Sequence, residues 1–349
     1  MHPNAFSWIK LVVQFTCVVS SLLINALLIT LIILKSPKNM GTYRHLMVFF
    51  SGFSMVFSIL DILVQPNITT YKSSFMMVMD YKLRELDPQI SRISMHLLCS
   101  CFGVAIFGIA VQFIYRFFSL ERKGRQRYFN KNMIFIWFLI PCLGGVAWFV
   151  IVSKVFDTSP IISDYIRKPV NDSFSIDVDN SVYVAGVFYP IDDTGRIVTH
   201  KRSFIAVAGF MGIMFVPFSI IIYFGYKSWC VVRNLLEQGN SEYSRKLQIQ
   251  LYKALVAQTL IPLFLLFIPF GLLFTLPMLE IECRVLAIFV NFVFAIYPLI
   301  DPLPILYYIE VFQAIPLLMQ PSVFIRECNT KHLLVITRYE EQRVRHLNV

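Results

Sequence analysis

Charged residues are scarce in this chain of 349 residues. Asp, Glu, Lys and Arg make up only 15% of the sequence, whereas hydrophobic residues make up 57% and the mean hydropathy is +0.65. A water-soluble fold places about a quarter of its residues in charged types, because its surface must be hydrated. The composition therefore excludes a soluble enzyme and predicts a protein whose surface mostly faces lipid.

Motifs for catalysis and metal binding are also missing. The sequence has no GxSxG, HExxH, Walker or GxGxxG pattern and no paired CxxC, so hydrolase, metalloenzyme and nucleotide chemistry have no candidate residues. The acidic segments 177–179 and 192–193 lack the spacing of a calcium-binding EF-hand and are more typical of solvated turns. We expect no enzymatic activity, no metal and no cofactor.

Seven long apolar runs are what the sequence has instead. They span 11–34, 46–65, 93–115, 133–152, 204–226, 254–279 and 285–309, and they contain only two charged residues, Asp61 and Asp301. Each run is long enough to cross a hydrocarbon core of about 30 Å as a helix, which satisfies its own backbone polar groups. The first run is too long for a signal peptide and lacks a cleavage site. The sequence predicts an all-α membrane protein, a bundle of seven transmembrane helices.

Basic residues indicate the orientation of the predicted bundle. The segments 35–45, 116–132, 227–253 and 310–349 carry 19 Lys and Arg against seven Asp and Glu, whereas the alternate segments are balanced. By the positive-inside rule, the N-terminus is extracellular and the basic segments face anionic lipid in the cytoplasm. No basic stripe is interleaved with exposed aromatic residues, so we expect no nucleic-acid partner.

Two glycosylation sequons agree with this orientation. Asn67 and Asn171 both fall on the predicted outer side. Asn171 is the better candidate, because Asn67 follows the second run almost directly and lies close to the bilayer. The sequons therefore support an extracellular face without fixing its structure.

Polar residues within the runs suggest functional positions. Asp61 lies about 6 Å below the outer end of the second run, and His96 lies at a similar depth in the third. One hypothesis is that they approach each other at an outer cavity; the alternative is that Asp61 reaches headgroups or water alone. Asp301 is too deep to contact Asp61 and needs another partner.

Prolines interrupt the sixth and seventh runs. Pro262, Pro269 and Pro277 lie in or near the sixth, and Pro298, Pro302 and Pro304 surround Asp301 in the seventh. Proline removes a backbone donor and bends a helix. The bends either allow the cytoplasmic end of the bundle to open or are static kinks, and the residues alone favour neither.

Several of these segments together resemble a known family. The similarity is carried by residues 35–47 (KSPKNMGTYRHLM), 57–61 (FSILD) with Pro66, 112–116 (QFIYR), 250–262 (QLYKALVAQTLIP) and 297–304 (YPLIDPLP). In this order they are similar to nematode seven-helix chemoreceptors of the Str type over about residues 10–310. The sequence departs from that pattern after the seventh helix, where Glu310, Gln313, Pro316 and Pro321 interrupt the expected basic surface helix.

The resemblance implies a G-protein-coupled receptor for environmental chemicals in the plasma membrane of sensory cilia. It implies a receptor domain over 1–310 and a cytoplasmic tail over 311–349. Tyr115 and Arg116 occupy the place of an acidic-Arg-Tyr triplet whose acid is lacking here. Arg116 is then a G-protein contact or, alternatively, a snorkelling interfacial arginine. Tyr115, Arg116, Asp301 and Pro302 are the predicted switch residues.

The cysteines do not form a recognisable disulfide framework on the predicted outer surface. Many seven-helix receptors tie the third helix to the second outer loop, but residues 153–203 contain no cysteine. Cys99 and Cys283 are the two cysteines near the predicted outer face, and they are either bonded to each other or two buried thiols.

The leading hypothesis is a receptor whose outer half binds an uncharged or weakly polar odorant and whose inner loops engage a heterotrimeric G protein. Candidate ligand contacts, chosen by depth, are Asp61, His96, Cys99, Ser100, Gly103, Phe270 and Phe274. A ligand-gated cation channel is an alternative, although it would place the N-terminus inside. A transporter is a third possibility, although seven spans do not divide into repeated halves.

Overall fold

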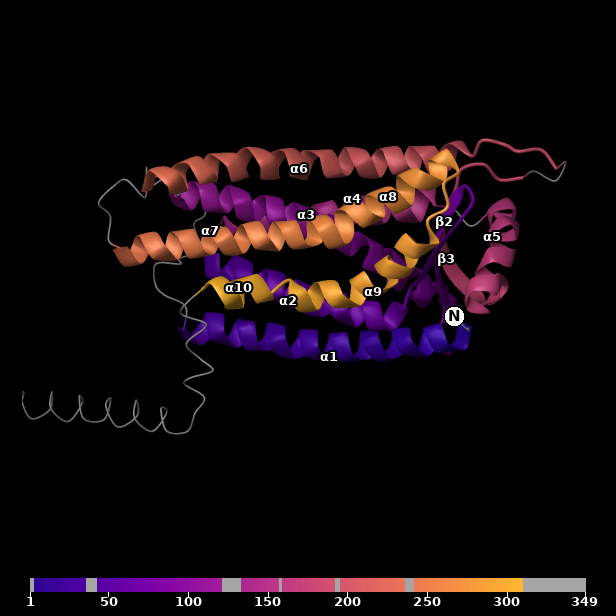
Figure 1. Cartoon of the computed structure of the whole chain (residues 1–349), viewed down its shortest axis with the longest axis horizontal. Coiled ribbons are helices and arrows are strands. Elements are labelled where there is room, and N and C mark those ends of the chain that lie inside the picture. Colours follow the sequence, from indigo (N-terminus) through magenta and orange to yellow (C-terminus); the bar gives the residue numbers. More distant parts are fainter. Residues whose placement is uncertain are drawn as a thin grey trace, which may run out of the picture.

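Seven membrane-crossing helices build the molecule. A computed structural model describes residues 3–35, 43–120, 133–156, 159–191, 195–235 and 242–309. Within these residues, seven helical spans are long and apolar enough to cross a bilayer, and they run side by side along the long axis (Figure 1). Their helices are α1 (Pro3–Lys35), α2 (Tyr43–Val64), α3 (Pro88–Leu120), α4 (Ile134–Val155), α6 (Lys201–Leu235), α7 (Glu242–Pro262) with α8 (Ile268–Thr275), and α9 (Arg284–Ile300) with α10 (Leu303–Tyr308). The predicted number of spans is confirmed.

Several helices extend beyond their apolar runs. The third span covers Pro88–Leu120 rather than 93–115, and the first helix begins at Pro3 rather than at 11. The longer first helix brings Lys10 into the bundle, where its side chain is buried. The longer third helix likewise includes the buried Arg116, so two charged residues outside the apolar runs lie among the helices.

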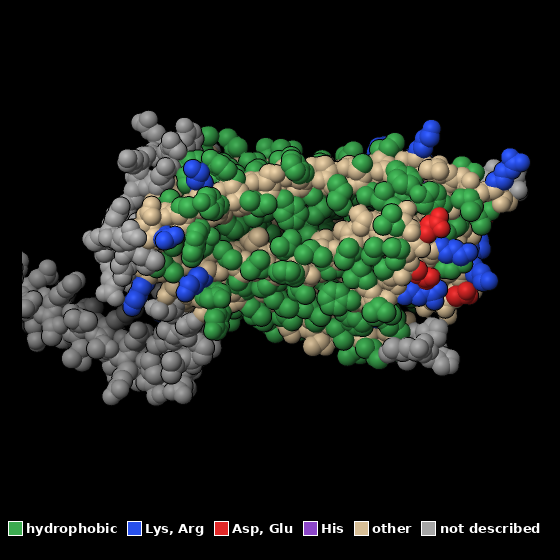
Figure 2. Space-filling view, turned by 45° about the horizontal axis from the view of Figure 1, so that its top comes forward, with side chains coloured by type: hydrophobic (Ala, Val, Ile, Leu, Met, Phe, Trp, Pro, Cys, Tyr) green, Lys and Arg blue, Asp and Glu red, His purple; other side chains and the backbone are tan. Residues whose placement is uncertain are grey.

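The helix α3 lies at the centre of the bundle. In its apolar stretch 78% of the residues are buried, compared with 28% in α4 and in α6. The surrounding helices expose large apolar side chains such as Leu23, Phe135 and Phe215. Figure 2 shows such side chains covering the middle of the molecule, with the described Lys and Arg side chains gathered near the two ends. This apolar belt is the surface expected of a protein immersed in lipid.

A small β-sheet closes one end of the bundle, and the sequence analysis did not predict it. The strands β1 (Asn67–Tyr71) and β2 (Ser74–Asp80) form a hairpin between α2 and α3, and β3 (Ser181–Val187) comes from the segment between α4 and α6. All pairings are antiparallel, in the order β1-β2-β3. The sheet lies at the end that also holds the beginning of α1 (Figure 1).

The two faces of the sheet have different neighbours. Ile68, Met77 and Val184 pair across the three strands and belong to the core of the bundle. The alternate residues pack under the helix α5 (Pro160–Phe174), in a cluster that includes Met76 and Tyr183. Successive side chains of a strand point to opposite faces, so one sheet covers the bundle and supports α5 at the same time.

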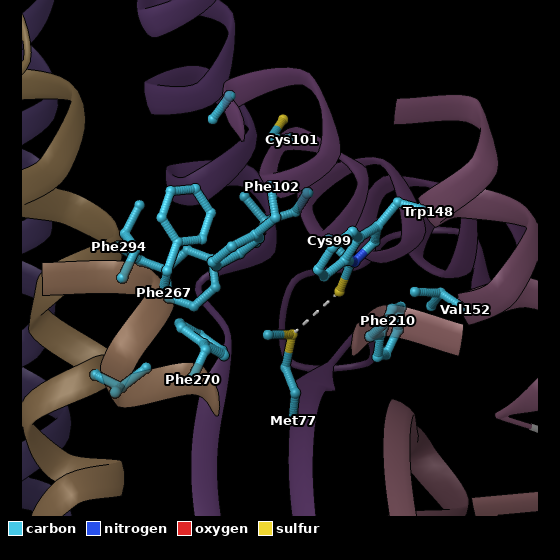
Figure 3. Packing of buried hydrophobic residues seen from close by; sticks show 14 of the residues in the cluster. Met77, Cys99, Cys101, Phe102, Trp148, Val152, Phe210, Phe267, Phe270 and Phe294 are labelled. Carbon is cyan, nitrogen blue, oxygen red and sulfur yellow. Dashed lines mark hydrogen bonds between the residues drawn. The ribbon is translucent and has the colours of Figure 1, made fainter. Parts of the chain in front are cut away.

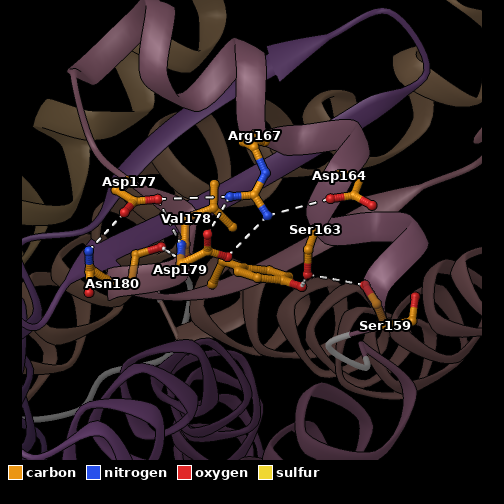
Figure 4. A network of polar contacts seen from close by, with 10 residues as sticks. Ser159, Ser163, Asp164, Arg167, Asp177, Val178, Asp179 and Asn180 are labelled. Carbon is orange, nitrogen blue, oxygen red and sulfur yellow. Dashed lines mark hydrogen bonds and ion pairs between the residues drawn. The ribbon is translucent and has the colours of Figure 1, made fainter.

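Polar contacts fasten α5 to the sheet. Arg167 bonds Asp179 at 2.5 and 3.0 Å and lies 3.4 Å from Asp164 (Figure 4). Asp177 accepts a bond from the Asp179 backbone and so caps the 3-10 turn Val178–Asn180. The Arg167 guanidinium holds the pKa of the Asp179 carboxyl below its usual value. The 177–179 segment is thus an arginine-paired turn, and residues 192–194 lie outside the described residues.

The predicted bends in the sixth and seventh spans are confirmed. A π-helical turn, η4 (Leu263–Phe267), follows α7, and a 3-10 turn, η5 (Leu276–Leu279), follows α8. The seventh span breaks at Asp301 and Pro302, between α9 and α10. Pro302 has no N–H for the carbonyl of Pro298, and the Asn25 side chain of α1 donates to that carbonyl instead, at 3.1 Å.

Glycines allow α3 and α4 to approach closely, which generates a prediction. A Cβ added to Gly103 would lie 2.4 Å from the carbonyl oxygen of Gly144. We expect Gly103→Ala to destabilise the protein by about 1–3 kcal/mol, because backbone has to move. Thermal unfolding in detergent measures the effect. The matched control is Gly212→Ala in α6, where an added Cβ meets nothing within 4 Å; an equal loss in both variants would contradict the prediction.

Candidate functional site

A small chamber lies between the sheet and the helices. It has a volume of about 50 Å³, and among the described residues no charged side chain lines it. The sheet forms its roof, α3 and α4 form one wall, and α6 and α8 form the other. Its main contacts come from Ile68, Phe75, Met77, Cys99, Phe102, Trp148, Phe210, Phe270 and Phe274.

Aromatic rings form most of the chamber wall. Trp148 stacks on Phe210 with ring centres 4.5 Å apart, and Phe102 meets Phe270 edge to face at 4.6 Å. Figure 3 shows these two pairs on opposite sides of Met77 and Cys99. Such ring pairs hold their geometry beyond what area burial alone provides. The wall is therefore a defined shape rather than a loose apolar gap.

Sulfur atoms are the most polarisable groups in the chamber, whose lining includes Met76, Met77, Cys99 and Met214. The Cys99 thiol of α3 lies 3.9 Å from the Met77 thioether of β2 (Figure 3). Thiols and thioethers are weak hydrogen-bonding partners and adapt to different shapes. The chamber thus combines a rigid aromatic wall with one soft contact between the roof and the bundle.

The depth-based prediction of ligand contacts is only partly consistent with this geometry. Cys99, Phe270 and Phe274 line the chamber, whereas Asp61, His96, Ser100 and Gly103 do not. His96 packs against Phe149 of α4, Ser100 donates to the Leu97 carbonyl at 2.7 Å, and Gly103 lies against α4. His96, Ser100 and Gly103 lie on other faces of α3 than Cys99, and Asp61 lies on α2.

The chamber residues that the sequence analysis missed come from the unpredicted sheet and from predicted helices whose inward faces were not assigned or, as for Phe102 on α3, only partly assigned. Phe75 and Met77 belong to the unpredicted sheet, and Trp148 and Phe210 belong to helices for which no inward face was assigned. The sequence signal for the strands of the roof was the content of Met and Val in the segments 74–80 and 181–187, which lie between apolar runs. The aromatic wall offers no comparable signal, because phenylalanine occurs throughout the spans.

Asp61 has partners on α1 rather than on α3. Its carboxylate accepts a bond from Gln14 at 3.1 Å and interacts electrostatically with Lys10. The expected contact with His96 is not formed, and Asp61 is fully buried, so it does not reach water alone. Lys10 also donates to the backbone carbonyls of Gln65 and Pro66, so this buried cluster ties α1 to the link between α2 and β1.

An outer hollow of about 380 Å³ adjoins the chamber. Ile68 lines both cavities, and no other residue lines both. The backbone of Ile68 is fixed by Asn291 of α9, which accepts from its N–H at 2.9 Å and donates to its carbonyl at 2.7 Å. The hollow is lined by Phe6, Ile68, Thr69, Tyr71, Lys168, Pro169, Asp172, Ser173, Phe174, Arg284, Ile288 and Asn291.

The predicted switch residues lie in two further clusters, away from the chamber. Arg116 is 1% exposed and donates to the Gln248 carbonyl of α7, so it does not snorkel to the interface in this structure. Tyr115 stacks on Tyr43 with ring centres 5.4 Å apart. These contacts connect α3 to α7 and to α2 at the end opposite to the sheet.

Asp301 has the separate partner that its depth required. Its carboxylate accepts from Ser54 of α2 at 3.1 Å, and its backbone carbonyl accepts from Gln258 of α7 at 3.0 Å. Pro302 begins the turn into α10. The break in the seventh span is therefore bonded to both α2 and α7.

The two predicted glycosylation sites and the two outer cysteines differ in their surroundings. Asn171 is exposed near the end of α5, whereas the Asn67 amide oxygen accepts from Lys10 at 2.7 Å. Cys99 and Cys283 are both free thiols, so the structure contains no bond between them. The tail beyond residue 309 lies outside the described residues.

Comparison with known proteins gives consistent matches over most of the chain. The family model described as "Serpentine type 7TM GPCR chemoreceptor Str" matches residues 10–315. Serpentine receptor class r-10 of Caenorhabditis briggsae is 29% identical over 308 residues, which cover 88% of this chain and 89% of the relative. G-protein coupled receptor str-217 of Caenorhabditis elegans is 29% identical over 292 residues, which cover 82% of each chain.

The resemblance inferred from the sequence is therefore confirmed. The seven spans and the family match describe a multi-pass membrane receptor of a class that is not enzymatic. Because the family model matches residues 10–315, the chain belongs to the Str family of serpentine seven-transmembrane chemoreceptors.

Proposed function

We propose that this receptor binds a small uncharged chemical in the chamber and signals to a heterotrimeric G protein at the opposite end of the bundle. The observation that carries the proposal is the aromatic chamber, in which no described lining residue is charged. An ion placed there would lose its hydration without gaining a partner. This environment favours an odorant of few atoms and little polarity, and the chamber of about 50 Å³ has to widen to admit one.

The bent sixth span offers a route from the chamber to the opposite end. Phe270 and Phe274 of α8 touch the chamber, and α8 continues through the π-helical turn into α7. A ligand shifts a two-state bundle only if it binds the two states unequally. Contacts with α8 supply such a difference, because movement of α8 changes the chamber wall and the position of α7 together.

Arg116 acts in this proposal as a latch of the inactive state. Its bond to the Gln248 carbonyl joins α3 to α7 where the basic segments lie. Release of this bond would let α7 move away and would free the guanidinium for a G protein. The Asp301 and Pro302 break gives the seventh span a matching point of flexure.

The proposed orientation has the N-terminus, the sheet and α5 outside the cell. The charge difference between alternate segments favours it, as does the exposed sequon at Asn171. A receptor for environmental chemicals would act in the plasma membrane, and in a nematode the sensory cilium is the membrane in contact with the surroundings. The family match supports this setting.

The outer hollow is the proposed entrance to the chamber. The sheet and α5 cover the chamber from above, and Ile68 borders both the chamber and the hollow, so its side chain is the proposed barrier between them. An apolar ligand would pass this one side chain, while Asn291 keeps the strand itself in place.

A cellular assay tests the whole proposal. The chain with an N-terminal tag is expressed with a promiscuous G protein and screened with uncharged volatile compounds for calcium release. We expect responses to a subset of them and staining of the tag on unpermeabilised cells. A tag that stays inaccessible on surface-delivered protein contradicts the orientation, and a preference for strongly charged compounds contradicts the chamber.

Filling the chamber should abolish the response. We expect Cys99→Phe to raise the concentration of an active compound needed for half-maximal response at least tenfold, because the new ring occupies the free volume. The matched control is Cys142→Phe, at an exposed position of α4. Equal effects of both variants at equal surface expression would show that the chamber is not the binding site.

Removing the Ile68 side chain should open the entrance. In the purified chain, methyl methanethiosulfonate labels Cys99, and we expect Ile68→Ala to accelerate this labelling at least fivefold relative to the exposed Cys142. Mass spectrometry of the labelled peptides measures both rates. Val182→Ala, on the same face of the sheet, is the control; an equal acceleration there would indicate general loosening instead of an entrance.

Breaking the latch should raise signalling without ligand. We expect Arg116→Met to increase basal signalling about tenfold, because a hydrogen bond from a charged donor contributes about 1.5–3 kcal/mol, whereas Arg116→Lys retains a donor and should show a smaller rise. Basal second-messenger level at matched surface expression is the readout. Lys253→Met, an exposed position of α7, should leave it unchanged, and an unchanged level in Arg116→Met would refute the latch.

A further inference from the structure

A third cavity opens at the end of the bundle opposite to the sheet. This crevice has a volume of about 510 Å³ and lies between the end of α1, the beginning of α2 and α4. It is separate from the chamber and shares no lining residue with it. The crevice is lined by Ile32, Ile33, Arg44, His45, Val48, Phe49 and Phe138.

The inner part of the crevice is an apolar slot. Phe49 of α2 stacks on Phe138 of α4 with ring centres 4.8 Å apart and an angle of 14° between the rings. Ile33 is 66% exposed on the neighbouring helix α1, so the slot borders the lipid-facing surface. A flat aromatic pair beside exposed aliphatic groups is a surface along which a hydrocarbon chain packs without losing any polar contact.

The rim of the crevice is cationic and unpaired. Arg44 and His45 are exposed in the first turn of α2, and neither has a hydrogen bond or ion pair with the residues that the structure describes. A cation at a helix N-terminus is disfavoured by the helix dipole, and an anion near the backbone N–H groups of that turn is favoured. An anion at the rim would pair with the cationic side chains and would also interact favourably with the N-terminus of α2.

We propose that this crevice binds an anionic phospholipid. Its phosphate lies against Arg44 and His45, and one acyl chain runs along Phe49, Phe138 and Ile33. A free anion would leave the apolar slot unused, and a neutral lipid would leave the cationic rim without a counter-charge. In the proposed orientation the crevice lies in the cytoplasmic leaflet, which holds the anionic lipids of a cell membrane.

Lipid binding by the intact chain tests this inference. The full-length protein in detergent is mixed with equimolar phosphatidylserine and phosphatidylcholine of identical acyl chains, and bound lipid is counted by native mass spectrometry. We expect at least a fivefold preference for phosphatidylserine, which is the contribution expected of one basic residue near an anionic surface. Equal binding of the two lipids would overturn the proposal.

Variants separate the rim from the slot. Arg44→Ala should remove the preference, and Arg44→Gln serves if that variant does not fold. Lys227→Ala, an exposed basic position on α6, should leave the preference intact; a loss as large as that of Arg44→Ala would indicate unspecific surface charge and overturn the site.

Val48→Trp fills the apolar slot while both rim residues remain. We expect it to reduce phosphatidylserine binding at least fivefold with an unchanged melting temperature. Undiminished binding would mean that the rim attracts the headgroup alone, and the crevice would not be a lipid site. None of these outcomes depends on an odorant or a G protein, so they are independent of the proposed signalling.

Discussion

Backbone polar groups that lose their regular partners inside an apolar bundle must find side-chain partners, and this requirement shapes the structure. Where Pro302 removes a donor from the seventh span, Asn25 donates to the carbonyl of Pro298. Where β1 forms the open edge of the sheet, Asn291 pairs with both backbone groups of Ile68. Where α2 ends, Lys10 donates to the carbonyls that follow. Each of these three irregularities is matched by a polar residue on a neighbouring helix.

These same contacts position the functional parts. Because Gln258 donates to the Asp301 carbonyl at the break, the seventh span bends there without exposing this backbone group to lipid. The fixed edge of β1 keeps the sheet over the chamber, and the pairing of β2 with β3 ties the segment between α4 and α6 to the bundle. In a chain with no cysteine in residues 153–203, main-chain hydrogen bonds provide the connection that a disulfide could have provided.

The sequence was sufficient for the spans but not for the site. Hydropathy predicts helices because lipid leaves the backbone no alternative, and prolines predict the bends because their chemistry is local. The sheet was missed because strand pairing depends on partners far apart in sequence, such as Met77 and Val184. Both hypotheses for Asp61, a contact with His96 or with headgroups and water alone, missed its partner Gln14, because depth along a helix does not give its rotation. The partner Lys10 lay just outside the apolar run that defined the first span.

Strand pairing through main-chain atoms has a consequence for how such a receptor can diversify. Ile68, Met77 and Val184 lie side by side on three strands. The hydrogen bonds that join these strands are made by main-chain atoms and do not involve the three side chains. Exchanging one of them for a larger or smaller residue changes the roof of the chamber and leaves the strand pairing intact. If the chamber binds the ligand as proposed, chemical preference can be altered one strand position at a time, without remodelling any helix.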